Sequence, residues 1–362
     1  MSRIECPVCL YMLDWEQAPL VTIGDDGAVS ALTLPPGESP AGRRLRLHTA
    51  YRTCDGRQPA HYLPADYGDQ HVNRVSVGMV GNATAGKTHL LAAMIGQFMR
   101  GVRLRQLSLQ VTPIDLRIHK KYVDEAVTPF LDRREVLQRT PLGAVDITDA
   151  FQVTNLDSGR RHSVTFFDVS GELLARAGPG EKEFLGAVNA LIFVVDPEKI
   201  RGLGRPDTAA PDATRSGGSE GDQAFDIVLK LLRVARAEQG ADFLGIPAAV
   251  VVTKSDLLRR GDRFVSWWLR AEADEDLDLG TVEEESGDVF TYLYTHGAER
   301  WLEPAEQCIQ STLHFASASG IAPRDGHFPD VYFRPRRVIK PLLALLAMKG
   351  VIDPSVLGGA PR

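Results

Sequence analysis

The clearest chemical pattern in this chain lies in the segment GNATAGKT. The eight residues that fit the pattern G-x-x-x-x-G-K-[ST] are Gly81, Asn82, Ala83, Thr84, Ala85, Gly86, Lys87 and Thr88. Small residues let backbone N–H groups wrap a phosphate, Lys87 adds a positive charge, and the Thr88 hydroxyl can bind Mg²⁺. The segment therefore predicts a nucleotide phosphate loop, without distinguishing ATP from GTP.

Two further motifs follow apolar stretches that read as strands. In FFDVSGE, Asp168 is placed to hold Mg²⁺, and Gly171 can turn its N–H toward a γ-phosphate. In VVVTKSD, the Asp256 carboxylate can accept from the two donors on the Watson–Crick edge of guanine, and adenine offers no matching pair. The aliphatic stem of Lys254 can lie along the base. We therefore expect Thr253, Lys254 and Asp256 to select guanine.

A third group of residues could bind a metal ion. Cys6 and Cys9 have the spacing of a zinc knuckle, and Cys54 supplies a third thiol. We predict His61 as the fourth ligand and structural zinc as the ion. Other histidines that could serve are His48 and His71. Reduced free thiols and a redox-active Cys-x-x-Cys are the alternatives.

These motifs need a regular frame, and strand and helix patterns alternate from residue 74 onward. The predicted strands are RVSVGMVG, DITDAFQVT, HSVTFFDV, NALIFVVDP, IPAAVVVTKSD and QSTLHFASASG. The predicted helices are THLLAAMIGQFM, AFDIVLKLLRVARA and RVIKPLLALLAMKG. Cys308 falls in a helix-like stretch and is expected to be buried. The alternation predicts the α/β class, with a mostly parallel sheet and flanking helices.

The texture of the chain divides it into parts. Residues 1–70 are rich in Pro, Gly and Tyr, show no sustained helical period and are predicted to form the cysteine-bearing, zinc-ribbon-like module. Residues 74–350 are predicted to form the nucleotide-binding domain, and 351–362 a tail. The stretches 201–222 and 271–288 are expected to be solvated insertions, or alternatively partner-facing surfaces.

Composition narrows the functional class. The 362 residues are 44% hydrophobic and carry a net charge of −6, so no overall basic field attracts nucleic acid or an anionic membrane. No apolar run approaches the ~20 residues of a membrane helix. The chain starts with a Cys-x-x-Cys rather than a basic-then-apolar leader. We expect a cytoplasmic protein without nucleic acid as a partner.

The order of these motifs resembles the translation-factor and Ras-like class of P-loop GTPases over residues 74 to about 350. The resemblance rests on 81–88, 168–171 and 253–256, and FASASG is similar to a further loop of that class. It implies that Ser317-Ala318 brings a backbone N–H to guanine O6. It also implies binding of GTP and GDP, Mg²⁺, and a hydrolysis-driven switch that acts on protein effectors or regulators.

A closer resemblance is to the bacterial double-GTPase families, Ras-like GTPases encoded in multi-gene conflict or signalling systems. The similar features are the N-terminal cysteine module, the D-x-x-G-E motif and the C-terminal helix.

Two positions depart from the Ras-like pattern. Glu172 stands where Ras-like enzymes commonly have a water-positioning glutamine, so intrinsic hydrolysis is predicted to be slow. Thr140 is our choice for the switch threonine that meets Mg²⁺ and the γ-phosphate, and Arg139 could act as an arginine finger or be a solvated switch residue. The other threonines considered are Thr128, Thr148 and Thr154.

The sequence is compatible with two other functions. The chain could be a GTP-binding scaffold with little turnover, a role that Glu172 would suit. It could also be an ATP-using P-loop enzyme such as a small-molecule kinase, against which the TKSD motif argues.

Overall fold

The computed structural model describes residues 3–24, 27–56, 60–69, 73–82, 84–138, 145–169, 185–200, 219–238, 240–270 and 281–353. Five predicted site residues lie outside these ranges: Ala83, Arg139, Thr140, Gly171 and Glu172. His71, the segment 201–218, the segment 271–280 and residues 354–362 of the tail also lie outside them.

A seven-stranded sheet forms the centre of the fold, in the order β13-β12-β11-β7-β10-β9-β8. Its strands are β7 (Asn73–Gly81), β8 (Leu109–Pro113), β9 (Val145–Asn155), β10 (Arg161–Val169), β11 (Ala190–Val195), β12 (Leu244–Val252) and β13 (Cys308–Phe315). Within the described sheet, β9 runs antiparallel to its neighbours and the other strands are parallel. The predicted α/β class with a mostly parallel sheet is confirmed, and β8 is a strand that the sequence patterns did not predict.

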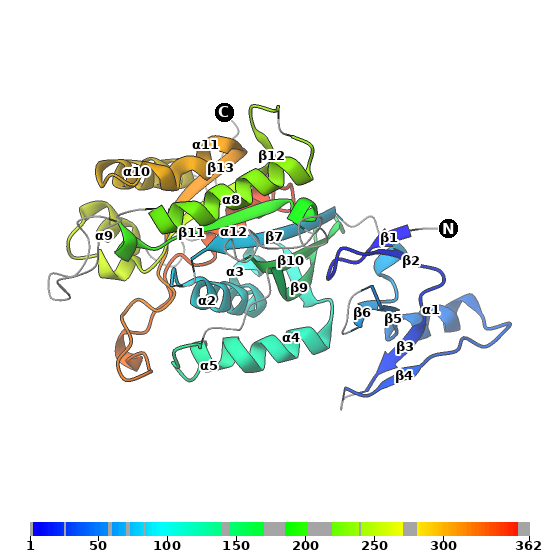
Figure 1. The fold of residues 1–362 in the computed structure, drawn as a ribbon. Coiled ribbons are helices and arrows are strands. Elements are labelled where there is room, and N and C mark those ends of the chain that lie inside the picture. The colour runs from blue at the N-terminus through cyan, green and yellow to red at the C-terminus, as the bar shows by residue number, and fades with distance from the viewer. Residues whose placement is uncertain are drawn as a thin grey trace.

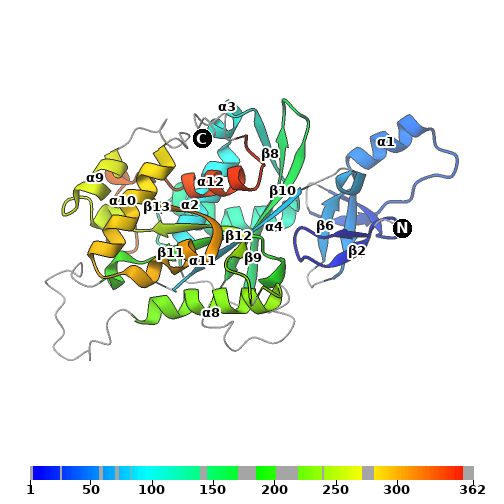
Figure 2. The same cartoon turned by 90° about the horizontal axis from the view of Figure 1, so that it is seen from above.

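Helices cover both faces of the sheet, which explains its continuous apolar strands (Figures 1 and 2). Every residue of β11 is buried. One face packs against α2 (Lys87–Arg100), α3 (Val102–Gln106), α5 (Thr128–Leu131) and α12 (Lys340–Met348). The other packs against α8 (Ser219–Ala235), α9 (Arg263–Arg270), α10 (Val282–Thr295) and α11 (Glu303–Gln307). The three predicted helices correspond to α2, α8 and α12.

Strand β7 lies where the connections of the sheet change direction, with β10 on one side and β11 on the other. The register places Asp168 beside Met79, and Val194 beside Gly81. Segments that leave the carboxyl ends of these strands therefore meet at one edge, the usual position of a ligand site in such sheets.

The N-terminal module consists of two small antiparallel sheets and one helix. Strands β1 (Arg3–Glu5) and β2 (Met12–Asp14) form a hairpin. The second sheet has the order β4-β3-β5-β6, formed by β3 (Leu20–Ile23), β4 (Val29–Ala31), β5 (Tyr51–Cys54) and β6 (His61–Pro64). Helix α1 (Pro40–His48) corrects the expectation of no sustained helix in this region. The Ser39 hydroxyl accepts from the Gly42 N–H, and Pro40 suits the first turn.

Short elements connect the main ones. They are α4 (Leu116–Tyr122), the π-helical turn η2 (Val123–Val127) and the 3₁₀ turns η1 (Tyr67–Asp69), η3 (Pro197–Lys199), η5 (Ser255–Leu257), η8 (Glu299–Leu302) and η9 (Asp330–Tyr332). None of the described helices is both long and apolar enough to cross a membrane.

Two sequence expectations are wrong in this part of the chain. The acidic run 271–288 is not wholly a solvated insertion, because α10 starts at Val282 and Glu285 is fully buried. Glu285 is tolerated there because Arg337 donates to both of its oxygens, at 3.1 and 2.7 Å. Cys308 is buried as predicted, but it begins strand β13 rather than lying in a helix.

The module is docked on the large sheet beside β9 and β10. The Thr165 hydroxyl of β10 donates to the Pro7 carbonyl at 2.7 Å, and this bond is buried. The Tyr62 N–H donates to Asp115 Oδ2 at 2.9 Å. A shared apolar cluster joins residues of the module, including Val8, to Ala150 of β9. The two parts therefore share an apolar cluster.

Candidate functional site

The predicted phosphate loop connects β7 to α2, the context that the motif requires. A side chain at Gly81 would meet the Val194 carbonyl oxygen at 2.8 Å, because β11 passes close to this point. Gly86 precedes the helix in the left-handed conformation, with φ 80°, which favours glycine. The local geometry therefore favours glycine at both positions. The N-terminus of α2 points its N–H groups toward the loop.

Lys87 and Asp168 are adjacent at the edge of the sheet. Lys87 Nζ lies 2.8 Å from Asp168 Oδ1 and donates to the Val169 carbonyl at 3.1 Å. Both side chains are largely buried, with exposed fractions of 6% and 13%. The predicted phosphate cation of α2 and the predicted Mg²⁺ carboxylate of β10 thus lie side by side, although they are far apart in sequence.

Thr253 ties the TKSD motif to the phosphate loop. Its hydroxyl lies 2.6 Å from the Ala85 carbonyl and 3.0 Å from the Val195 carbonyl, so a single proton is shared between them. The side chain is buried. Thr253 therefore positions the loop that would contact the nucleotide.

Lys254 is held by two acidic side chains that the sequence reading missed. Its Nζ donates to both carboxylate oxygens of Asp196 at 3.1 Å and to Glu198 Oε2 at 2.6 Å. Burial opposes protonation, but Glu198 and Asp196 raise the pKa of Lys254 above its ordinary value. Asp196 is buried and also accepts from the Thr84 hydroxyl at 3.3 Å. The signal that could have revealed it is its place at the end of NALIFVVDP, next to β7 and β12.

Asp256 lies beside the loop that follows β13. The Ser317 hydroxyl donates to Asp256 Oδ1 at 2.5 Å. Burial raises the pKa of Asp256, while the Ser317 hydrogen bond lowers it. The Ser317 N–H is already donated to the Arg336 carbonyl at 3.0 Å, which leaves Ala318 as the backbone donor predicted for guanine O6.

Many of these residues line one cavity of about 360 Å³, whereas Asp168, Asp196 and Ser317 are not among its lining residues. From the sequence motifs it is lined by Thr84, Gly86, Lys87, Thr88, Thr253, Lys254, Asp256 and Ala318. The other lining residues come from 136–138, from 319–323 and from His89, Glu198, Leu257 and Phe328. The volume is within the range of ligand pockets, and the phosphate-loop and base-selecting motifs share it.

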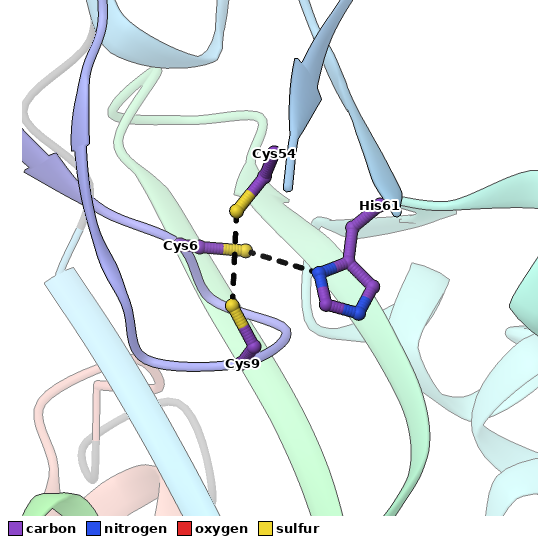
Figure 3. Close-up of side chains that lie close together, drawn as sticks. All are labelled: Cys6, Cys9, Cys54 and His61. Carbon is purple, nitrogen blue, oxygen red and sulfur yellow. Dashed lines mark hydrogen bonds between the residues drawn. The ribbon is translucent and has the colours of Figure 1, made fainter. Parts of the chain in front are cut away.

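The predicted metal ligands are gathered in the module (Figure 3). Cys6 and Cys9 lie on the loop between β1 and β2, where the Leu10 N–H donates to the Cys6 carbonyl. Cys54 ends β5 and His61 begins β6, and the two are direct cross-strand partners. The chain thus presents two ligands from a tight turn and two from a hairpin.

The spacing of the four ligand atoms suits zinc, since they all lie within 4.8 Å of one another. The Cys9 and Cys54 sulfurs are 3.7 Å apart, and Cys6 Sγ lies 4.0 Å from His61 Nδ1. Zn–S bonds of about 2.3 Å in a tetrahedron place two sulfurs roughly 3.8 Å apart. Burial opposes protonation of His61, yet Cys54 and Cys9 raise its pKa to about 9. His48, the alternative ligand within the described residues, lies at the exposed end of α1.

Comparisons with solved structures found similarities with low TM-scores. No protein-family model and no curated protein matches the sequence. The chain is similar to a bacterial selenocysteine-specific elongation factor, EF-Sec, at 16% identity and a TM-score of 0.27, covering 68% of this chain and 26% of that one. It is similar to the S. cerevisiae Ski7 GTPase-like domain bound to GTP, at 13% identity and a TM-score of 0.31, covering 76% of this chain and 50% of that one. The chain spans at most half of either protein, and superpositions this loose carry no argument about function.

Proposed function

We propose that this chain binds GTP with Mg²⁺ and hydrolyses it to GDP and phosphate, acting as a switch toward protein partners. The observation that carries the proposal is the shared cavity, in which Lys87 of the phosphate loop and Asp256 of the TKSD motif line the same space. A nucleotide is long enough to reach both. The carboxylate selects guanine because only guanine offers it two adjacent donors.

In this proposal the residues act by positioning and charge. Lys87 and the N–H groups at the start of α2 would bind the phosphates, and the oxygens of Thr88 and Asp168 would hold Mg²⁺, for which oxygen ligands are preferred. When bound, Mg²⁺ would neutralise charge on the β- and γ-phosphates. Thr140, Arg139, Gly171 and Glu172 keep the roles proposed from the sequence: the switch threonine, an arginine finger, a γ-phosphate N–H and the water-orienting residue.

The test is nucleotide affinity in the wild type and in Asp256→Asn. We expect the wild type to prefer GTP and GDP over ATP and XTP. The variant should lose guanine affinity by tenfold or more and gain XTP binding, since xanthine replaces one guanine donor with an acceptor that an amide can pair. A wild type that prefers ATP would overturn the proposal in favour of an ATP-using enzyme.

Glu172 favours a second function, a GTP-binding scaffold with little turnover. Its charge would oppose the γ-phosphate unless it is paired. A single-turnover assay with saturating protein separates the two functions: hydrolysis of bound GTP within minutes supports a switch enzyme, and intact GTP after hours supports the scaffold. A setting in a bacterial conflict or signalling system belongs to the same proposal and rests on the family resemblance.

We further propose that Cys6, Cys9, Cys54 and His61 hold a structural Zn²⁺. The support is the largely buried four-ligand arrangement, which leaves no open position for a substrate in a tetrahedral site. A closed site of this kind would fold a segment whose own apolar core is small.

A further inference from the structure

Two segments distant in sequence pair beside the nucleotide cavity. The Val136 N–H donates to the Gly326 carbonyl at 2.9 Å, and the Phe328 N–H donates to the Arg134 carbonyl at 2.7 Å. Between these bonds, Glu135 and His327 form an antiparallel bridge. We call residues 134–137 together with 324–328 the clasp. In Figure 1 the orange loop beyond β13 descends beside the end of α5, from which residues 134–137 continue.

The clasp is anchored to the helix of the phosphate loop. The Leu137 N–H donates to His89 Nε2 at 3.1 Å, and His89 directly follows Thr88. Burial, aided by Lys254, lowers the pKa of His89 to about 4, so near neutral pH the ring is uncharged and can accept this bond. The ring also packs edge-on against Phe130 and Phe328, at centroid distances of 5.0 and 5.8 Å.

Both halves of the clasp reach the cavity. Val136 and Leu137 of the first half and Phe328 of the second line it together with Lys254 and Asp256. A guanine nucleotide that reached both Lys87 and Asp256 in this cavity of about 360 Å³ would contact these apolar side chains as well as the two polar motifs. Backbone hydrogen bonds between two segments far apart in the sequence hold this part of the cavity wall in place.

We propose that the clasp retains bound guanine nucleotide and that separation of its two halves governs nucleotide release. This inference rests on the proposed function, because it assumes that the cavity binds GDP and GTP. Leu137 lies two residues before the predicted switch residues Arg139 and Thr140. The clasp therefore joins the residues just before the predicted switch segment to the loop after β13. A partner protein that separates the two halves would act as a nucleotide exchange factor.

Gly326 allows a sharp test of the clasp. It has φ 80° with open space around its Cβ position, so a substitution strains the backbone without a clash. Gly297, in the turn after α10, has φ 66° and equally open space, and it is absent from the cavity lining, so it serves as a matched control. We expect release of a fluorescent N-methylanthraniloyl-GDP, measured by chase with unlabelled GDP, to be about tenfold faster in Gly326→Val and unchanged in Gly297→Val.

A second variant keeps the inference testable if Gly326→Val fails to fold. Glu135 and His327 lie between the two flanking bonds, where antiparallel partners have Cα atoms roughly 4.5 Å apart, within disulfide range. In the double variant Glu135→Cys with His327→Cys, oxidation should slow GDP release at least tenfold, and dithiothreitol should restore it. Each single cysteine variant and the wild type, treated alike, are the controls.

The possible results separate the two proposals. If GDP binds but its release is the same with the disulfide formed and reduced, the clasp does not retain nucleotide and the inference is overturned. If the wild type binds no GDP at all, the proposed function falls, and the inference falls with it. Slower release on oxidation supports both.

Discussion

Asp196 connects the phosphate loop to the base-selecting motif, although it contributes to neither pattern in the sequence. Its two oxygens hold Lys254, and one of them also accepts from Thr84. A charge-assisted bond of this kind contributes about 1.5–3 kcal/mol, and more where water is excluded. Asp196 is thus a positioning residue for Lys254, whose stem is expected to lie along the base.

Asp196→Asn tests this role, because the amide keeps the size of the side chain and removes its charge. We expect roughly tenfold weaker GDP and GTP binding, equivalent to about 1.4 kcal/mol, because Lys254 is no longer fixed. Single-turnover hydrolysis at saturating protein should stay within threefold of wild type. The control is Glu299→Gln, which removes the charge of an exposed carboxylate absent from the cavity lining and should matter little. Equal losses in the two variants would contradict the special role of Asp196.

At the scale of elements, a buried ionic cluster joins α10, β13 and the start of α12. Glu285 accepts from Arg337, lies 3.2 Å from His314 Nδ1 and accepts from the Phe315 N–H at 3.1 Å. Because β13 leads into Ser317, this cluster sits directly behind the loop that contacts Asp256. Removing one partner of such a cluster leaves a buried charge without compensation.

Glu285→Gln should lower the free energy of unfolding by about 3 kcal/mol, as measured by urea denaturation. The control is Glu284→Gln, an exposed neighbour on the same helix, which should change stability by less than about 0.5 kcal/mol. Similar losses in the two variants would show that the cluster contributes no special stability.

The Glu285 carboxylate also makes the free energy of unfolding depend on pH, and the direction of its pKa shift gives the direction of that dependence. Burial alone would raise the pKa of Glu285, but His314 and Arg337 lower it to about 2 in the folded chain. Because the folded-state pKa lies below the ordinary value of 4.5, ionised Glu285 makes its full contribution to the free energy of unfolding above pH 4.5. That contribution is lost as the pH falls toward 2. In Glu285→Gln we therefore expect a shallower loss of stability over this acid range than in the wild type.

The sequence predicted the elements that local pattern governs. The motifs that follow the strands predicted that Lys87, Asp168, Thr253 and Asp256 would lie near one another, because the carboxyl ends of parallel strands must meet at one edge. The clasp escaped prediction because the pairing of Glu135 with His327 depends on the whole fold and has no periodic signature. The burial of Glu285 was missed for a similar reason. The acidic run predicted a solvent-exposed segment, but Arg337, which is distant in sequence, compensates the charge of Glu285 and allows its burial.

At the scale of the molecule, the N-terminal module is packed against the large sheet. Cys6 and Cys54 belong to the same apolar cluster as Ile114 and Ala150 of the large domain. A metal that orders the module should therefore stabilise the whole chain, by mass action on the folded state.

Metal analysis should find one zinc per purified chain, and Cys54→Ser should remove most of it. We expect the variant to unfold in a single calorimetric transition, roughly 5–10 °C lower than the wild type, because the shared apolar cluster links the two parts. Cys308→Ala is the control that removes a buried thiol far from the site and should keep its zinc. Wild-type zinc near zero would contradict the metal site, and two separate transitions would contradict the link through the shared apolar cluster.

The buried bond from Thr165 to the Pro7 carbonyl also has a consequence during synthesis on the ribosome. The N-terminal module is synthesised first. Strand β10, on which it docks, is made roughly 100 residues after His61, about 5–20 s later at ordinary elongation rates. Throughout that interval three thiols face solvent without their apolar cover. Early capture of zinc by the nascent chain would protect them from oxidation, and cellular zinc supply would then set the yield of folded protein.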